Sequence, residues 1–250
     1  MAAATTTVGA FVACTPQASN PQTPSSISTR STAGETPNAL PTGPGGSAIA
    51  ALDGIRVAGR GPRTGYLRKQ FGQGWLDTDR NGCDTRNDIL RRDLTDLQVK
   101  PGTRDCVIAS GRLFDPYTRQ DIAFVRGGVS EVEIDHVVAL GNAWVTGASG
   151  WDYSRKSAFA NDPLNLLAVS RSANRQKGDG DAATWLPNNK SYRCDYVARQ
   201  VAVKKKFGLY VTSPERDAMN RVLQDCPNQP LPTGGNPVTS PLREPAPTSA

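Results

Sequence analysis

The sequence has a single histidine, no long apolar run and no CxxC pair, and each of these features excludes or disfavours a class of protein or site. Its 250 residues include one histidine, His136, so any chemistry that needs an imidazole near neutral pH depends on this side chain. No stretch approaches the ~20 consecutive apolar residues of a membrane-spanning helix, so no transmembrane segment is predicted. The five cysteines contain no CxxC pair, which disfavours a zinc site.

Four of the cysteines form an even set that suits disulfides in an exported protein. They are Cys83, Cys106, Cys194 and Cys226. Four cysteines allow three pairings, and proximity in the sequence favours Cys83 with Cys106 and Cys194 with Cys226.

The fifth cysteine ends a short segment that resembles the later part of an export signal. Residues 1–14 contain small residues, then GAFVA, then Cys14, without the basic residues that usually come first. We therefore interpret them as a truncated signal. Because FVAC resembles a bacterial lipoprotein cleavage box, Cys14 is a candidate lipid anchor. These features predict a secreted or cell-envelope-attached, extracytoplasmic bacterial protein.

Composition divides the rest of the chain into a folded domain between two tails. Residues 15–48 are rich in Pro, Ser and Thr and predict a disordered linker, and residues 227–250 predict a disordered Pro-rich tail. Nearly all charged residues lie in the predicted domain, 49–226, and the net charge of the chain is +6. A basic domain between neutral tails suggests an anionic partner such as nucleic acid, although a solubilising surface is the simpler alternative.

One acidic segment of this domain matches the opening of an EF-hand calcium loop. Its candidate ligands are Asp77, Asp79, Asn81 and Asp88. Two departures weaken the match, because Asp84 stands at the usual apolar position and Asp88 replaces the bidentate glutamate. Clusters of Asp, Asn and Gly also form ordinary turns, so a calcium site and a turn both remain open.

Apolar periodicity predicts helices and strands on both sides of a central stretch, and therefore an α+β fold. The expected elements are a helix over 87–97, a hairpin of strands 106–113 and 120–125, and two helices over 191–207 and 213–226. The second disulfide would close the two later helices into a helical hairpin. Three tryptophans are expected to be core anchors: Trp144, Trp151 and Trp185.

The central stretch, residues 132–177, contains the single histidine. It reads VEIDHVVALGNAW and, about twenty residues later, DPLNLLAVSRSANRQKGDG. An apolar run ends at Asp135 and His136, and a second strand, 164–169, leads through the N-cap candidate Ser170 into a helix that ends at Gly178. In a regular strand Asp135 and His136 point to opposite faces, so they share a site only if the strand ends there.

The side chains of this stretch suit phosphodiester hydrolysis. An imidazole such as His136 activates water near neutral pH, and a carboxylate and an amide, Asp135 and Asn174, hold a hard divalent cation. Three cations on the helix of Asn174 are candidates for phosphate binding: Arg171, Arg175 and Lys177.

This stretch resembles the HNH (ββα-metal) endonucleases, specifically the exported bacterial HNH proteins with a DUF1524-type domain. The resembling residues are EIDHVVALGNAW, FANDPLNLLAVSRSANRQKGD and the WLP at 185–187, within a wider match over about 65–226 that includes NGCDTRNDIL. The resemblance implies a ββα-metal core with an added N-terminal hairpin and helix and a C-terminal helical hairpin, stapled by disulfides.

The resemblance also implies a role for each matching residue. Asp135 and Asn174 would bind the metal, His136 would be the general base, and Asn165 would brace the loop that carries His136. Asn174 stands where the family has its final histidine, which shifts the expected metal from zinc or nickel to Mg²⁺ or Mn²⁺. Glu133 would contact an outer-sphere water.

The leading hypothesis is a metal-dependent endonuclease that hydrolyses DNA, with RNA as an open alternative, and with little sequence specificity. Two other functions remain. A non-catalytic extracellular nucleic-acid-binding protein explains the charge but gives no reason for the Asp, His and Asn pattern. A calcium-stabilised envelope binding protein would be built around residues 77–88.

Overall fold

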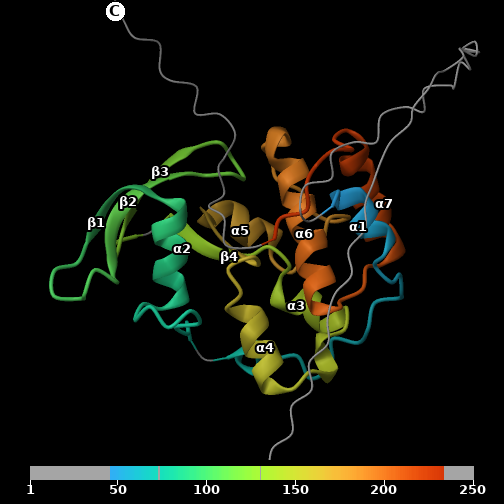
Figure 1. Cartoon of the computed structure of the whole chain (residues 1–250), viewed down its shortest axis with the longest axis horizontal. Helices are drawn as coiled ribbons and strands as arrows, with labels where there is room; N and C mark the ends of the chain where they lie inside the picture. The colour runs from blue at the N-terminus through green and yellow to red at the C-terminus, as the bar shows by residue number, and fades with distance from the viewer. Residues whose placement is uncertain (1–45, 73, 130, 234–250) are drawn as a thin grey trace, which may run out of the picture. The chain divides into compact units, whose positions relative to one another are not determined.

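The computed structural model describes residues 46–72, 74–129 and 131–233 (Figure 1). The predicted signal at 1–14 with Cys14, the linker up to residue 45 and the tail from residue 234 lie outside the described residues. The folded part extends beyond the predicted bounds of 49 and 226, because Ser47 forms a β-bridge with Pro230. The backbone N–H of Ala48 also donates to the carbonyl of Gln229 at 2.9 Å.

The N-terminal half of the domain builds a three-stranded antiparallel sheet covered by one helix. The elements are α2 (Thr85–Asp93), β1 (Thr95–Val99), β2 (Ile108–Phe114) and β3 (Asp121–Val125), in the sheet order β1-β2-β3. The DPYTR turn joins β2 to β3, as predicted. The prediction of a helix over 87–97 was wrong at its end, because the chain becomes extended at Leu94 and residues 95–99 pair with β2.

The central stretch forms two antiparallel strands followed by a helix. These are β4 (Val132–His136), β5 (Leu166–Ser170) and α5 (Arg171–Lys177). Asp135 pairs with Leu167 and His136 with Leu166, so β4 ends at His136 as predicted. Ser170 takes the N-cap position of α5 and Gly178, with a φ of 52°, ends it.

The connection between β4 and β5 contains helices that were not predicted from the sequence. They are α3 (Leu140–Val145), η2 (Ala148–Gly150) and α4 (Tyr153–Ala160), and η1 (Arg68–Phe71) precedes them in the chain. Asp152 caps α4 by accepting a hydrogen bond from the backbone of Arg155. Eight residues or fewer in each helix give a weak periodic signal, which explains the omission.

Helices also close the fold at both ends of the described chain. The elements are α1 (Ala48–Asp53), η3 (Lys190–Tyr192), α6 (Arg193–Phe207) and α7 (Ser213–Gln224). Disulfides join Cys83 to Cys106 and Cys194 to Cys226, which confirms the pairing favoured by proximity. Each closes a loop of a few tens of residues and stabilises the fold by about 3 to 4 kcal/mol in the chain-entropy model.

The two strands β4 and β5 lie between two hydrophobic clusters. Leu167 and Val169 belong to a cluster with α1, α6 and α7, whereas Leu166 and Ala168 belong to one with α2, β2 and β3. Alternate side chains of β5 therefore face opposite clusters, and all five residues of this strand are buried. In Figure 1, β4 and α5 accordingly lie between the three-stranded sheet and the C-terminal helices.

The three tryptophans predicted as core anchors contact the hydrophobic clusters. Trp144 is a buried residue of α3, and Trp151 packs against the same cluster. Trp185 packs against the cluster formed with α1, α6 and α7. None of the helices in the described part of the chain is long and apolar enough to cross a bilayer.

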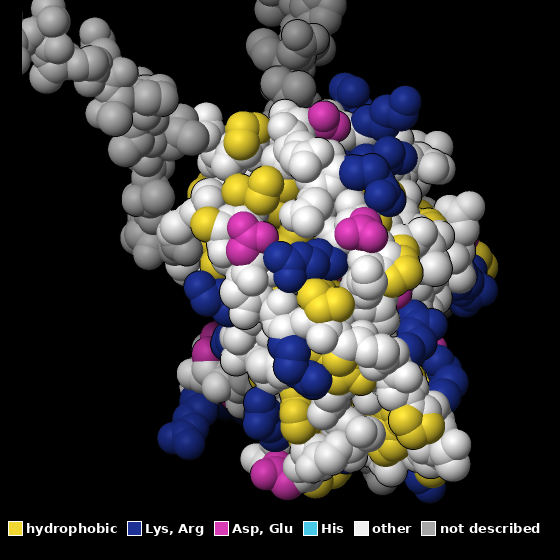
Figure 2. All heavy atoms as spheres, turned by 90° about the vertical axis from the view of Figure 1, so that its right-hand side faces the viewer, with side chains coloured by type: hydrophobic (Ala, Val, Ile, Leu, Met, Phe, Trp, Pro, Cys, Tyr) yellow, Lys and Arg dark blue, Asp and Glu magenta, His cyan; other side chains and the backbone are white. Residues whose placement is uncertain are grey.

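Basic and acidic side chains are interspersed on the face of the domain that Figure 2 draws. On the face drawn in Figure 2, Lys and Arg side chains are scattered with Asp and Glu between them, rather than gathered into one patch. Charge alone therefore does not locate a binding site on this face.

Candidate active site at the end of β4

Asp135 is held from two sides inside the domain. Its Oδ1 accepts a hydrogen bond from the ammonium of Lys177 at 2.9 Å, and its Oδ2 accepts one from the hydroxyl of Tyr117 at 2.6 Å. Tyr117 is fully buried and packs edge-on against Trp185 and Tyr196, so its hydroxyl has a fixed position. The carboxylate is thus oriented by neighbours from two separate segments, α5 and the turn between β2 and β3.

Lys177 occupies a different place from the one predicted. Its side chain is fully buried, and its ammonium donates to the carbonyl of His136 at 2.8 Å as well as to Asp135. A buried ammonium needs an anionic partner, which Asp135 supplies. The prediction that Lys177 contacts phosphate is therefore wrong, because its ammonium is buried and bonded to Asp135 and His136.

His136 points away from Asp135, as strand alternation requires. Its ring lies parallel to that of Trp75, with centroids 6.1 Å apart, and its Nε2 is 2.9 Å from the carbonyl oxygen of Ala160. A carbonyl oxygen only accepts hydrogen bonds, so Nε2 carries the proton. In the neutral ring, Nδ1 then holds the free lone pair, and no residue in the described ranges donates to it.

The surroundings of His136 keep its ring neutral. Burial disfavours the charged imidazolium, and the nearby guanidinium of Arg68 disfavours it further. Together they lower the pKa of His136 from 6.5 to about 4. At neutral pH the ring is therefore able to accept a proton.

One cavity brings the predicted residues together. A hollow of about 270 Å³ is lined by Asp135, His136, Asn174 and Arg175, and by Arg68 from η1 and Asp179 after α5. Asp135 and His136 reach it although they leave β4 in opposite directions, because the strand ends at His136. Adjacent residues at a strand end can therefore line one cavity, as a site shared by Asp135 and His136 requires.

Asn165 does not line this cavity but fixes the backbone that follows His136. Its Oδ1 accepts from the N–H of Val138 at 2.8 Å, and its Nδ2 donates to the carbonyl of the same residue at 3.2 Å. Its own carbonyl accepts from the N–H of Val137. Asn165 is fully buried, and its side chain and backbone together hold the two residues after His136 in place.

Asn174 is oriented by Glu133. Its Nδ2 donates to the Glu133 carboxylate at 2.9 Å, which leaves its amide oxygen without a hydrogen-bond partner among the described residues. Glu133 also forms ion pairs with Arg171 and Arg175, at 3.9 Å and 3.2 Å. Of these two predicted phosphate-binding residues, Arg175 lines the cavity and is mostly exposed.

The acidic segment before α2 forms a turn. Asp77, Asp79 and Asp88 accept hydrogen bonds from the backbone or side chain of Asn81, and Asp77 also accepts one from the N–H of Gly82. No group of three or more His, Cys, Asp or Glu residues in the described ranges is spaced to hold a metal ion. These contacts make the segment a turn, and the calcium site stays a prediction.

Sequence reasoning missed three residues that surround the site. Arg68 and Trp75 come from a segment about sixty residues before His136, and Tyr117 comes from the hairpin turn. Trp75 is the one with a usable signal, because it ends the aromatic sequence GYLRKQFGQGW. Nothing in the local sequence connects any of them to β4.

The folded domain matches a known protein family. Residues 84–222, more than half of the chain, match the family described as GmrSD restriction endonucleases, C-terminal domain. The chain belongs to this nuclease family. The matched range includes β4, β5 and α5, and therefore Asp135, His136, Asn165 and Asn174.

A curated relative extends the likeness beyond the matched domain. It comes from Arthroderma benhamiae (strain ATCC MYA-4681 / CBS 112371) and is named "Uncharacterized secreted protein". The two proteins are 39% identical over 197 residues, which cover 76% of this chain and 92% of the relative. The two disulfides and a secreted relative are consistent with a protein outside the cytoplasm. No solved structure matches the chain.

Proposed function

We propose that this protein is an HNH-type (ββα-metal) endonuclease that hydrolyses phosphodiester bonds with His136 as its general base. The observation that carries the proposal is the cavity at the end of β4, where Asp135, His136 and Asn174 meet. The order of β4, β5 and α5 supports the ββα-metal assignment, and membership of a nuclease family supports the reaction class.

In the proposed reaction, Nδ1 of His136 takes a proton from the attacking water. The hydrogen bond from Nε2 to Ala160 holds the ring in the tautomer that leaves Nδ1 free. Asn165 keeps the ring in position through the backbone of the next two residues. The low pKa of His136 keeps the base unprotonated at neutral pH.

The donors in the cavity fit a hard divalent cation. A carboxylate and an amide oxygen, from Asp135 and Asn174, are ligands that Mg²⁺ and Mn²⁺ prefer, and neither thiolate nor a second imidazole is present for zinc. Each oxygen of Asp135 keeps a second lone pair beyond its bonds to Lys177 and Tyr117. A bound cation would neutralise the charge that builds on the phosphate.

Cations around the cavity suit a nucleic acid, and we propose DNA as the main substrate. Arg175 and Arg68 line the cavity and would contact phosphates on either side of the cleaved bond. Contacts of this kind carry no base information, so cleavage would have little sequence specificity and binding would weaken steeply with salt.

A plasmid-nicking assay tests the proposal. The wild type should nick DNA with Mg²⁺ or Mn²⁺ and stop in excess chelator. Asn174→Ala should need roughly 10- to 100-fold more metal, whereas Asn188→Ala, at an exposed asparagine, should behave as the wild type. Full activity in chelator would refute the metal-dependent mechanism, and binding without cleavage under every metal would favour a non-catalytic nucleic-acid-binding protein.

A further inference from the structure

A second, larger cavity adjoins the proposed catalytic one. It has a volume of about 530 Å³ and shares Arg68, His136 and Leu140 with the smaller cavity. Neither the proposed base nor the proposed metal ligands need a space of this size. Its volume lies in the usual range for a small organic ligand.

Aromatic side chains form part of the wall of this larger cavity. The ring of Trp75 lies parallel to that of His136. Phe71 also lines the space, as does Ala160, whose carbonyl bonds His136. The backbone beside Trp75 is fixed, because the N–H of Leu76 donates to the side chain of Asn161 at 2.9 Å. The carbonyl of Leu76 accepts from the N–H of Thr85 at 2.8 Å. These two hydrogen bonds hold the backbone next to Trp75 in place.

The rim of the larger cavity is positively charged. Arg68 and Lys69 are exposed, and neither forms an ion pair with another residue of the described ranges. Elsewhere near the site the cations are paired, as Arg175 is with Glu133 and Lys177 with Asp135. Two unpaired cations at the mouth of an aromatic cavity complement an anionic ligand that carries a flat ring.

We propose that this larger cavity receives an unpaired nucleobase of the strand whose phosphodiester lies at His136. The inference rests on the proposed function and deepens it, because it assigns the substrate class as single-stranded or locally unpaired nucleic acid. A base inside an intact duplex is stacked and paired and does not reach such a cavity without leaving the helix. Trp75 supplies the stacking surface, and Arg68 and Lys69 contact the flanking phosphates.

Binding by the wild-type protein gives the first test. Fluorescence anisotropy in excess chelator would compare a labelled single-stranded oligonucleotide, the same strand with abasic positions, and its duplex. The intact single strand should bind roughly 10-fold or more tightly than either of the others. Equal affinity for the intact and abasic strands would overturn the proposal, since phosphate contacts alone would then explain binding.

A substitution at Trp75 tests whether the nucleobase stacks on this side chain. Trp75→Ala should weaken single-strand binding roughly 5- to 100-fold and leave duplex binding unchanged. Tyr153→Ala is the matched control, because Tyr153 is 62% exposed and lines neither cavity. Trp75→Phe keeps a stacking ring and should keep most of the affinity, so recovery in this variant separates lost stacking from misfolding. Wild-type single-strand affinity in a folded Trp75→Ala would refute the assignment.

These results are independent of the outcome at His136. If no nucleic acid is cleaved under any metal, the proposed function fails while the base-dependent binding is still measured. If cleavage requires His136 but the intact and abasic strands bind alike, the proposed function stands and the nucleobase cavity is refuted.

Discussion

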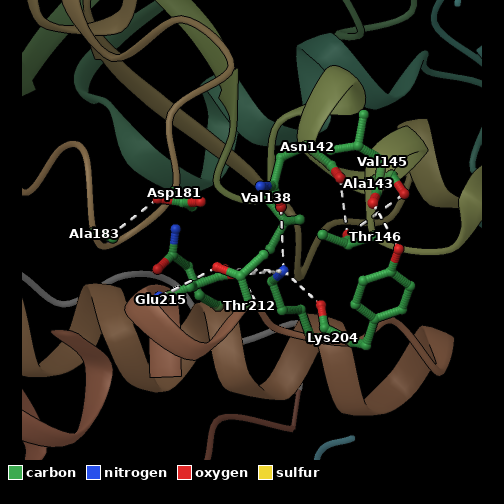
Figure 3. A network of polar contacts seen from close by, with 12 residues as sticks. Val138, Asn142, Ala143, Val145, Thr146, Asp181, Ala183, Lys204, Thr212 and Glu215 are labelled. Atoms are coloured by element: carbon green, nitrogen blue, oxygen red, sulfur yellow. Dashed lines mark hydrogen bonds and ion pairs between the residues drawn. The ribbon is translucent and has the colours of Figure 1, made fainter. Parts of the chain in front are cut away.

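Lys177 and Lys204 are both fully buried, and each lies 2.9 Å from a carboxylate oxygen, of Asp135 and Glu215 respectively. Lys204 points from α6 toward Glu215 at the start of α7 and also donates to Asn142 (Figure 3). Both partners of that pair are fully enclosed by protein. Asp135, in contrast, lines the cavity at the end of β4. A buried lysine–carboxylate ion pair therefore occurs once in the interior of the fold and once beside the cavity at the end of β4.

The comparison indicates what decides the role of a buried ion pair. Burial lowers the pKa of Lys204 and raises that of Glu215, so the pair stays charged only because each partner neutralises the other. This ion pair joins α6 to the start of α7. Lys177 instead joins the Asp135 side chain to the backbone of His136, the two residues on which the proposed reaction depends.

Removing the interior lysine should have the largest effect on stability. Lys204→Met leaves the Glu215 carboxylate buried without a partner, and we expect a loss of about 3 to 5 kcal/mol in the free energy of unfolding. Urea denaturation measures this loss, and the exposed neighbour Lys205→Met is the control. The cleavage rate of the folded fraction should stay at the wild-type value. A lower rate in fully folded Lys204→Met would break the comparison.

The corresponding change at the site, Lys177→Met, should lower the stability less than Lys204→Met does and the cleavage rate more. Lys177→Met leaves Asp135 at a cavity wall that water reaches, so we expect a smaller loss of stability, about 2 to 3 kcal/mol. The cleavage rate should fall roughly 10- to 100-fold, because Asp135 and the His136 backbone lose the cation that positions them. Urea denaturation and a nicking assay on the same sample measure both. An unchanged rate would mean that Lys177 serves only the fold.

A fall in pH should lower the free energy of unfolding by a smaller amount, through the protonation of His136. The pKa of His136 is about 4 in the folded state, below the 6.5 of the free side chain, so the unfolded chain binds the proton more tightly. The stability that His136 contributes is complete above pH 6.5 and is lost as the pH falls from 6.5 toward 4. Between neutral pH and about pH 5 we expect His136 to account for a loss of about 2 kcal/mol. His136→Gln should remove this part of the pH dependence, and an identical dependence in wild type and variant would contradict the low pKa.

Much of the candidate site is readable from the sequence because it is local. The strand that ends at His136, the strand and helix that carry Asn165 and Asn174, and both disulfides follow from short patterns of apolar residues, caps and cysteines. The helix predicted over 87–97 was wrong at its end because the strand β1 is defined by pairing with residues 108–112, which local periodicity does not contain.

The parts that were missed depend on contacts between distant segments. Lys177 looked like a surface cation of a polar helix, and only the meeting of α5 with β4 and Tyr117 reveals it as buried. Arg68 and Trp75 reach His136 from a segment whose only local signal is its aromatic content. A sequence pattern gives the residue types at a site but not the neighbours that set their charge and pKa.

The central claim is that His136 acts as the general base and is not mainly a structural residue. The most direct test is to measure the cleavage rate and the melting temperature of His136→Ala on the same sample. We predict a rate loss of roughly 10² to 10⁴. The variant should stay folded, with a loss of about 2 kcal/mol or somewhat more in stability for the lost hydrogen bond to Ala160 and the lost packing against Trp75. Added imidazole should restore part of the rate, since His136 lies between two cavities that would admit it. A His136→Ala protein that cleaves at the wild-type rate, or that loses activity only as it unfolds, would contradict the claim.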